Sequence, residues 1–138
     1  MIPVLKRIDH VGIVVADLAA HVSQLEALGL SFERSNANEE SFAVYYPCGD
    51  ASVELIDVRA PEARERRLPE GEEARIEHIA FEVEDLEAVR SELEGRGVTV
   101  SWPPFPSGTA EMIWTIAETS GGVQYQFLRR PGSEGTQR

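Results

Sequence analysis

Two histidines in this chain are each followed, at a similar distance, by a side chain whose oxygen could bind a metal ion. Glu54 comes 44 residues after His10, and Gln126 comes 48 residues after His78. Two imidazoles, a carboxylate and a carboxamide suit a borderline or hard divalent cation such as Ni, Co, Mn, Fe or Zn. Coordination positions left open on such an ion would admit water or substrate, which is typical of a catalytic site. The four residues therefore predict a site for one divalent metal ion.

The two histidines lie at equivalent places in an internal repeat. Residues 8–29 read IDHVGIVVADLAAHVSQLEALG and residues 76–97 read IEHIAFEVEDLEAVRSELEGRG, so a shift of 68 positions aligns His10 with His78. A repeat of this kind indicates one supersecondary unit that is used twice. A single histidine such as His21 is more simply explained as a structural residue, whereas a matched pair favours a shared role.

Hydrophobic periodicity predicts the same elements in both copies. Alternation over 7–15 is typical of a strand, and the apolar positions that follow Asp17 recur at helical spacing up to Gly29. The second copy repeats this strand and helix, with Asp85 as the helix cap. Further strands are expected at 30–34, 41–47, 51–58, 98–101, 112–117 and 123–128.

The faces of these strands place the candidate ligands together. Successive side chains of a strand point to opposite faces. Val53 and Leu55 are expected to pack under the helix, which turns Glu54 to the other face, and Tyr125 and Phe127 do the same for Gln126. His10 and His78 are turned away from their helices by the same reasoning.

Each copy therefore reads as a βαβββ module, and the predicted class is an α+β fold in one domain. The modules cover 5–59 and 74–130, joined by a charged, exposed linker at 60–73, and a disordered tail is expected at 131–138. Prolines in WPPFP, residues 102–106, are expected to interrupt the strands of the second module. The two tandem modules are expected to pair about a pseudo-twofold axis and to form a concave sheet that encloses the metal site.

Composition excludes several classes of function. The chain has 138 residues, a hydrophobic content of 42% and a net charge of -11, which argues against nucleic acid as a partner. No apolar run approaches the roughly 20 residues that span a membrane, and the opening MIPVLKRIDH lacks the apolar core of a signal peptide. Cys48 is the single cysteine, so no internal disulfide forms and a cytoplasmic location is expected.

Four segments resemble the metal-ligand blocks of the vicinal oxygen chelate superfamily, which includes glyoxalase I, methylmalonyl-CoA epimerase, extradiol dioxygenases and bleomycin resistance proteins. The segments are IDHVGIVVADL, VELIDV, IEHIAFEVEDLEAVRSELEGRGV and SGGVQYQFL, and the resemblance is greatest to methylmalonyl-CoA epimerase-like members. By this resemblance His10, Glu54 and His78 fall on ligand positions, and Gln126 falls where many relatives carry glutamate. The relatives are commonly dimers, so a homodimer is expected.

The resemblance implies an epimerase or isomerase that removes a proton next to a metal-chelated carbonyl of a small-molecule substrate. Glu54 would serve as ligand and as catalytic base, because the carboxamide of Gln126 cannot accept the proton. The segment PFPSGTAEMIWTIAETSGG lacks the His-Pro pair usual in epimerases, so sugar-like or polyketide-like carbonyl compounds stand beside acyl-CoA as substrates. Two alternatives remain: an Fe(II) or Mn(II) ring-cleaving dioxygenase that uses His10, His78 and Glu54, and a metal-free resistance protein that sequesters a ligand.

Overall fold

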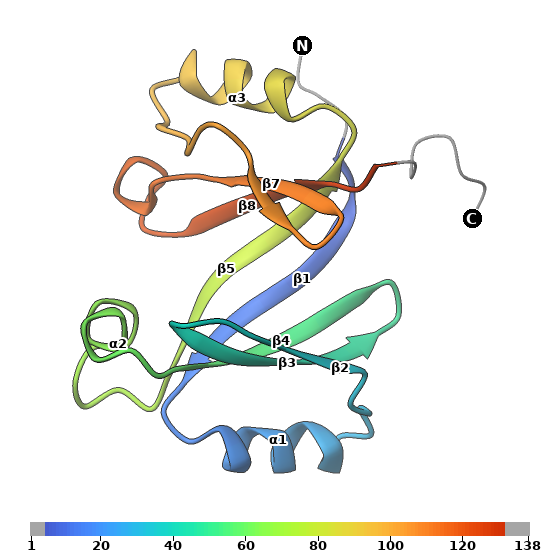
Figure 1. Ribbon diagram of the computed structural model, residues 1–138, viewed down its shortest axis with the longest axis vertical. Coiled ribbons are helices and arrows are strands. Elements are labelled where there is room, and N and C mark those ends of the chain that lie inside the picture. The colour runs from blue at the N-terminus through green and yellow to red at the C-terminus, as the bar shows by residue number, and fades with distance from the viewer. Residues whose placement is uncertain (1–4, 132–138) are drawn as a thin grey trace. The chain divides into compact units, whose positions relative to one another are not determined.

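The computed structural model describes residues 5–131 and contains the βαβββ order twice (Figure 1). This order confirms the predicted α+β class and the two modules, with a short additional helix in the linker. Residues 132–138, where a tail was predicted, lie outside the described residues. The elements are β1 (Leu5–Val15), α1 (Leu18–Ala27), β2 (Arg34–Ala37), β3 (Ser41–Cys48), β4 (Ala51–Val58), α2 (Pro61–Arg67), β5 (Ala74–Val83), α3 (Leu86–Glu94), β6 (Phe105–Ser107), β7 (Ala110–Trp114) and β8 (Gln124–Arg129).

Backbone contacts divide the chain into two compact units. The first unit is His10–Glu77, and the second joins the residues up to Asp9 with those from His78 onward. Strand order is β2-β3-β4-β1 in the first module and β6-β7-β8-β5 in the second, so the order is the same in both. The first and last strands of each module are parallel neighbours.

The two longer helices begin and end as the repeat predicts. Asp17 Oδ1 accepts a hydrogen bond from the Ala20 amide at 3.1 Å, and Asp85 Oδ1 accepts one from the Ala88 amide at 3.0 Å. Both carboxylates satisfy amide groups that the first helical turn leaves without a partner. Gly29, at φ 101°, adopts the left-handed conformation that follows α1. Among residues 5–131, no helix combines the length and the apolar character needed to cross a membrane.

The first unit packs apolar side chains on both faces of its strands. Under α1, Val15, Leu55 and Tyr46 form a buried cluster with residues of the helix. On the opposite face, Val14 and Ile56 belong to a second cluster that α2 and the residue after it cover. Apolar packing therefore holds both faces of the strands in this unit.

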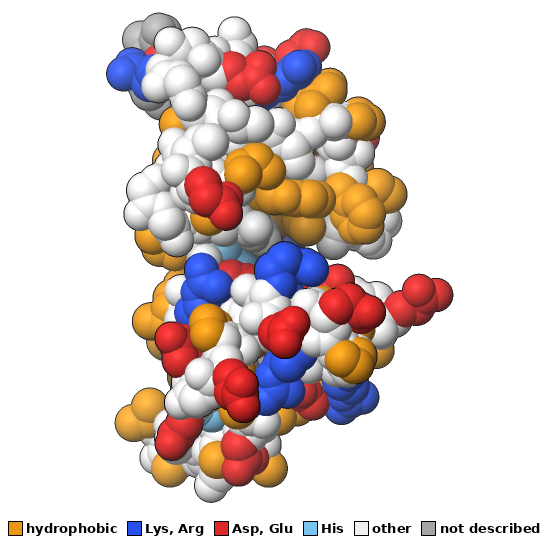
Figure 2. Space-filling view, turned by 90° about the vertical axis from the view of Figure 1, so that its left-hand side faces the viewer, with side chains coloured by type: hydrophobic (Ala, Val, Ile, Leu, Met, Phe, Trp, Pro, Cys, Tyr) orange, Lys and Arg blue, Asp and Glu red, His pale blue; other side chains and the backbone are white. Residues whose placement is uncertain are grey.

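In the second unit, an apolar cluster lies between α3 and its strands. Val83, Leu86 and Ile113 are buried there, and the partly buried Phe81 and Tyr125 pack against them. Phe81 and Val83 alternate with His78 along β5, and Tyr125 alternates with Gln126 along β8, as the sequence predicts. Large apolar side chains also lie on the surface of this unit, among them Trp102, Phe105, Ile116 and Val123. Figure 2 shows hydrophobic side chains gathered on one face of the molecule, in the upper half of the view.

Two expected strands differ most from the structure. The strand expected at 30–34 begins only at Arg34, and the segment 98–101 contributes a single bridge between Val100 and Thr115. The proline segment interrupts the strands as expected, since residues 101–104 belong to no strand. β6 then begins at Phe105, with Pro106 opposite Glu111, at the edge of the strand order, where a proline is tolerated.

Candidate functional site

The first unit brings His10 and Glu54 together. His10 lies on β1 and Glu54 on β4, and both residues are buried, with 8% of each exposed. His10 Nε2 lies 3.3 Å from Glu54 Oε1. The strand register explains this approach, because Glu54 is opposite Gly12, two residues after His10 on the same face.

Tyr45 completes this half of the candidate site. Its hydroxyl donates a hydrogen bond of 2.8 Å to Glu54 Oε2. Its ring meets the His10 ring edge-on, with the ring centroids 6.0 Å apart. Glu54 therefore directs one carboxylate oxygen to a phenol and the other to an imidazole.

Tyr45 was not predicted as a neighbour of Glu54, although the hairpin between β3 and β4 places it there. Strands β3 and β4 form a hairpin in which Cys48 pairs with Ala51 across a two-residue loop. Counting back from that loop places Tyr45 directly opposite Glu54. The hairpin register would therefore have identified Tyr45 as the neighbour of the carboxylate.

The electrostatic surroundings keep the phenol of Tyr45 protonated. Burial of the hydroxyl and the negative charge of Glu54 both raise the pKa of Tyr45, and burial is the larger cause. The Arg34 guanidinium lies over the Tyr45 ring at 3.7 Å from its centroid and opposes this rise. Tyr45 is thus a hydrogen-bond donor to Glu54 throughout the neutral pH range.

The second unit places His78 and Gln126 in the register that His10 and Glu54 have in the first unit. Gln126 on β8 is opposite Ala80, two residues after His78 on β5. His78 is 3% exposed and Gln126 8% exposed. Gln126 Nε2 donates to Gln124 Oε1 at 2.9 Å, so the carboxamide oxygen of Gln126 is the atom left for a cation.

An acidic residue directly precedes each histidine, and arginines bind it. Asp9 Oδ1 accepts from Arg7 and from Arg130, both at 2.9 Å. In the other unit, Arg67 donates to both oxygens of Glu77, at 2.8 and 2.9 Å, and also to Glu40.

The hydrogen bond to Glu77 is the main cause that raises the pKa of Arg67. These arginines are engaged within the protein, and they hold the strands that carry the histidines.

The donor set has the chemistry of a divalent metal centre. His10, Glu54 and His78 each offer one ligand atom of a type that such ions bind, and all three residues are buried. Two neutral imidazoles and one carboxylate are a common ligand set for Zn and for non-haem Fe(II). The carboxamide oxygen of Gln126 is a weaker donor that could occupy a fourth position.

The chain is similar in fold to several solved structures. Its likeness to methylmalonyl-CoA epimerase from Mycobacterium tuberculosis has a TM-score of 0.81 at 20% identity, over 97% of this chain and 95% of that one. A variant of Streptomyces coelicolor methylmalonyl-CoA epimerase in complex with 2-nitronate-propionyl-CoA gives 0.79 at 23% identity, over 93% and 99%. A hypothetical protein from Bacillus halodurans gives 0.76 at 21% identity, over 90% and 94%.

The match to a protein family is independent of these structures. No curated protein sequence matches the chain. Residues 9–123, most of both modules, match the model of a family whose members include glyoxalases, bleomycin resistance proteins and dioxygenases. The chain therefore belongs to the Glyoxalase/Bleomycin resistance protein/Dioxygenase superfamily.

Proposed function

We propose that this protein is a divalent-metal-dependent epimerase or isomerase that removes the proton next to a substrate carbonyl. The observation that carries the proposal is the matched register of the two modules. Each module presents a buried histidine on its first strand and a buried oxygen donor on its last, on the face turned away from the longer helix. A repeat that retains both donors in both copies favours one shared centre.

In this proposal His10, Glu54, His78 and Gln126 hold one ion of Ni, Co, Mn, Fe or Zn. The bound ion would supply Lewis-acid polarisation of the substrate carbonyl. The His10–Glu54 contact of 3.3 Å supports the proposal because it brings an imidazole nitrogen and a carboxylate oxygen close enough to share a ligand. The two modules would meet about a pseudo-twofold axis, as the repeat predicts.

Glu54 is the proposed base. The substrate C–H bond breaks, the proton moves to a carboxylate oxygen of Glu54, and the electron pair left behind is delocalised onto the carbonyl oxygen. Tyr45 holds Glu54 Oε2 at 2.8 Å, so rotation of the carboxylate is restricted and Oε1 is the oxygen directed toward His10. Return of the proton to the other face of the carbon gives epimerisation, and return to the neighbouring carbon gives isomerisation.

The proposed substrate is a small carbonyl compound, and a CoA thioester is the first class to test. A similar solved structure is described as methylmalonyl-CoA epimerase in complex with methylmalonyl-CoA, at 23% identity. We also propose a cytoplasmic homodimer, as for many relatives in this superfamily.

Metal content and proton exchange together test this proposal. We expect about one divalent ion per chain in protein purified without chelator, and loss of that ion in His10→Ala and in His78→Ala. His21→Ala is the matched control, since His21 lies on α1, and it should keep the ion. In Glu54→Gln, loss of deuterium from the α-position of labelled methylmalonyl-CoA should fall by at least a hundredfold, as for removal of a general base.

Three results would contradict the proposal. Glu54→Gln that keeps its metal and exchanges deuterium at the wild-type rate would remove Glu54 as the base. Oxygen uptake with a catechol in place of proton exchange would indicate a dioxygenase. Unchanged ligand affinity in both histidine variants, with no metal in the wild type, would indicate a protein that sequesters a ligand.

A further inference from the structure

Arg34, Tyr45 and Glu54 form one row across three strands of the first unit. Arg34 on β2 is directly opposite Tyr45 on β3, and Tyr45 is directly opposite Glu54 on β4. Residues directly opposite each other on neighbouring strands point to the same face of a sheet. Arg34 therefore lies on the face that carries the proposed base, at the outer end of the row, because β2 is last in the strand order.

The charge of Arg34 is placed close to Glu54 by Tyr45. The guanidinium carbon lies 3.7 Å from the centroid of the Tyr45 ring, and the Tyr45 hydroxyl donates to Glu54 Oε2 at 2.8 Å. Burial and the charge of Glu54 raise the pKa of Tyr45, and the positive charge of Arg34 works against them. One phenol group therefore separates the guanidinium from the carboxylate.

Arg34 retains hydrogen-bond donors for a ligand. Its Nε lies 3.9 Å from Glu33 Oε1, and more than half of each of these side chains is exposed, so this ion pair contributes little. Stacking on Tyr45 holds the plane of the guanidinium, while the N–H groups at its edge can still bind a planar acid. Arg67, by contrast, donates to both oxygens of Glu77 and is engaged within the protein.

The equivalent row of the second unit is apolar. Trp114 on β7 is directly opposite Gln126, as Tyr45 is opposite Glu54. β6 takes the place of β2 in the strand order, and its Phe105 meets the Trp114 ring edge-on, with the centroids 6.0 Å apart. Two uncharged rings therefore replace the phenol and the guanidinium, so recognition of an anion belongs to the first module.

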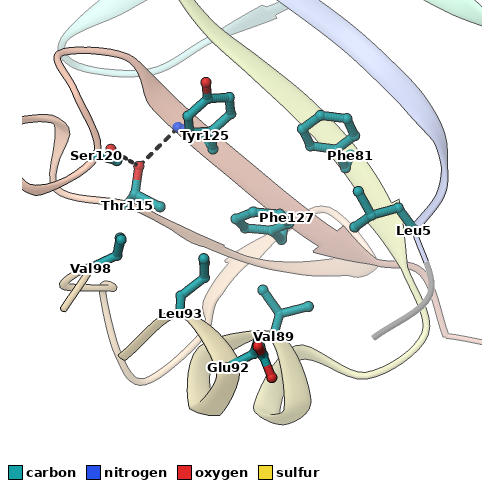
Figure 3. A pocket seen from close by; sticks show the side chains of 10 residues that line it. All are labelled: Leu5, Phe81, Val89, Glu92, Leu93, Val98, Thr115, Ser120, Tyr125 and Phe127. Atoms are coloured by element: carbon teal, nitrogen blue, oxygen red, sulfur yellow. Dashed lines mark hydrogen bonds between the residues drawn. The ribbon is translucent and has the colours of Figure 1, made fainter. Parts of the chain in front are cut away.

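A cavity of about 300 Å³ in the second unit, between α3 and its strands, is also unsuited to an anion. Val89 and Leu93 of α3 line it opposite Phe127 of β8 (Figure 3). Glu92 is the charged residue among those that line it, and its Oε2 accepts from Arg96 Nε at 2.8 Å. The other side chains around this cavity offer an anionic group no positive charge.

We propose that Arg34 determines substrate specificity by binding a carboxylate of the substrate, next to the proton that Glu54 removes. This inference rests on the proposed function, in which Glu54 is the base. The planar fork of an arginine matches a carboxylate and binds it through two hydrogen bonds. An acid group at or next to the reacting carbon suits the spacing of one phenol group, whereas the phosphates of CoA lie at the far end of its pantetheine arm. The substrate is therefore an acid as well as a carbonyl compound.

Binding of methylmalonyl-pantetheine and of its methyl ester tests the inference on the intact chain. Both compounds carry the thioester carbonyl and neither carries a phosphate, but the ester lacks the carboxylate. By calorimetry, Arg34→Gln should weaken binding of the acid by about tenfold and change binding of the ester by less than about twofold. Arg34→Lys keeps the charge without the fork, so its affinity for the acid should lie between those of the wild type and Arg34→Gln.

Arg59→Gln is the matched control. Arg59 also lies over an aromatic ring of β3, with its guanidinium carbon 4.9 Å from the centroid of Phe42, and its side chain is 60% exposed. Phe42 packs against the cluster under α1, on the face opposite Glu54. Arg59→Gln should therefore bind both compounds as the wild type does.

Three results would overturn the inference. The first is a wild type that does not bind the acid, or an Arg34→Gln variant that binds it equally well. The second is an equal loss for acid and ester in Arg34→Gln, which would mean that Arg34 acts only through Tyr45. The third is a loss for methylmalonyl-CoA that is absent for methylmalonyl-pantetheine, which would assign Arg34 to a phosphate of CoA.

Deuterium exchange at the α-position separates this inference from the proposed function. If the wild type exchanges deuterium and Arg34→Gln leaves the KM of the acid unchanged, the function stands and the role of Arg34 is lost. If Arg34→Gln weakens only the acid and the wild type shows no exchange, Arg34 stands as the carboxylate site and Glu54 is lost as the base.

Discussion

Tyr45 donates a hydrogen bond to Glu54, and the pKa of its hydroxyl determines the pH at which this bond is lost. Its pKa is raised in the folded protein, so the folded state keeps the phenol proton where the unfolded chain, with a pKa near 10, begins to release it. This contribution to stability is fully present below about pH 10. It is lost as the pH rises from there toward the folded pKa.

Tyr45→Phe is expected to flatten the alkaline loss of stability. Above about pH 10.5, the free energy of unfolding of the wild type should fall more steeply by up to about 1.4 kcal/mol per pH unit, since one more proton is released on unfolding. Urea unfolding at a series of pH values from 8 to 11.5 measures both slopes. Equal slopes in the two proteins would show that Tyr45 titrates alike in the folded and unfolded states.

At the residue level, the faces on which His10 and His78 lie could be predicted from strand alternation, and the repeat makes the two positions equivalent. Their role as metal ligands stays a prediction. Tyr45 was overlooked because strand alternation describes one strand at a time. Its contact with Glu54 is made between strands, through a register that only the hairpin loop fixes.

At the scale of elements, the N-caps of α1 and α3 occupy equivalent positions in the repeat, so the same substitution can be compared in both helices. Asp85→Ala should lower the free energy of unfolding by about 1 kcal/mol, because the Ala88 amide loses its acceptor. Asp85→Ser should keep most of the stability, since its hydroxyl caps in the same way. Urea unfolding compares the two variants, and Asp17→Ala extends the comparison to α1. A loss in the serine variant as large as in the alanine variant would show that charge, not capping, matters.

Elements with strong periodicity could be predicted from the sequence, and short edge elements could not. The strands β1, β4 and β5 carry continuous apolar patterns and were expected at nearly the observed residues. By contrast, all four residues of β2 and all three of β6 are exposed. An exposed strand leaves no hydrophobic pattern, because its ladder to one neighbour is the only contact that defines it.

At the scale of the whole molecule, the net charge of -11 affects the capture of substrate. If the substrate is a CoA thioester, as the proposed function suggests, like charges repel during encounter. We then expect kcat/KM to rise severalfold between about 0.01 and 0.1 M salt, as the Debye length falls from about 30 to about 10 Å. Steady-state rates at several ionic strengths test this, with kcat as the internal control. A fall in kcat/KM over the same range would indicate a local basic surface that attracts the substrate.

The α+β fold of two modules could be predicted because one repeat encodes both, while the contacts of the linker and the cavity could not. Arg67 binds Glu77, 10 positions away, and Glu40, 27 positions away, and no local pattern indicates the second contact. The cavity under α3 is lined by side chains of the helix and of paired strands, and their proximity has no signature in any one segment of the sequence.

The three-residue strand β6 has a consequence for association between chains. Pro106 has no amide hydrogen to offer, and the strand is too short to serve as a template for a partner strand. Phe105, with 55% of its surface exposed, would otherwise make this border attractive for fibril growth. This edge of the second unit therefore offers no continuous row of backbone groups onto which another chain could add a strand.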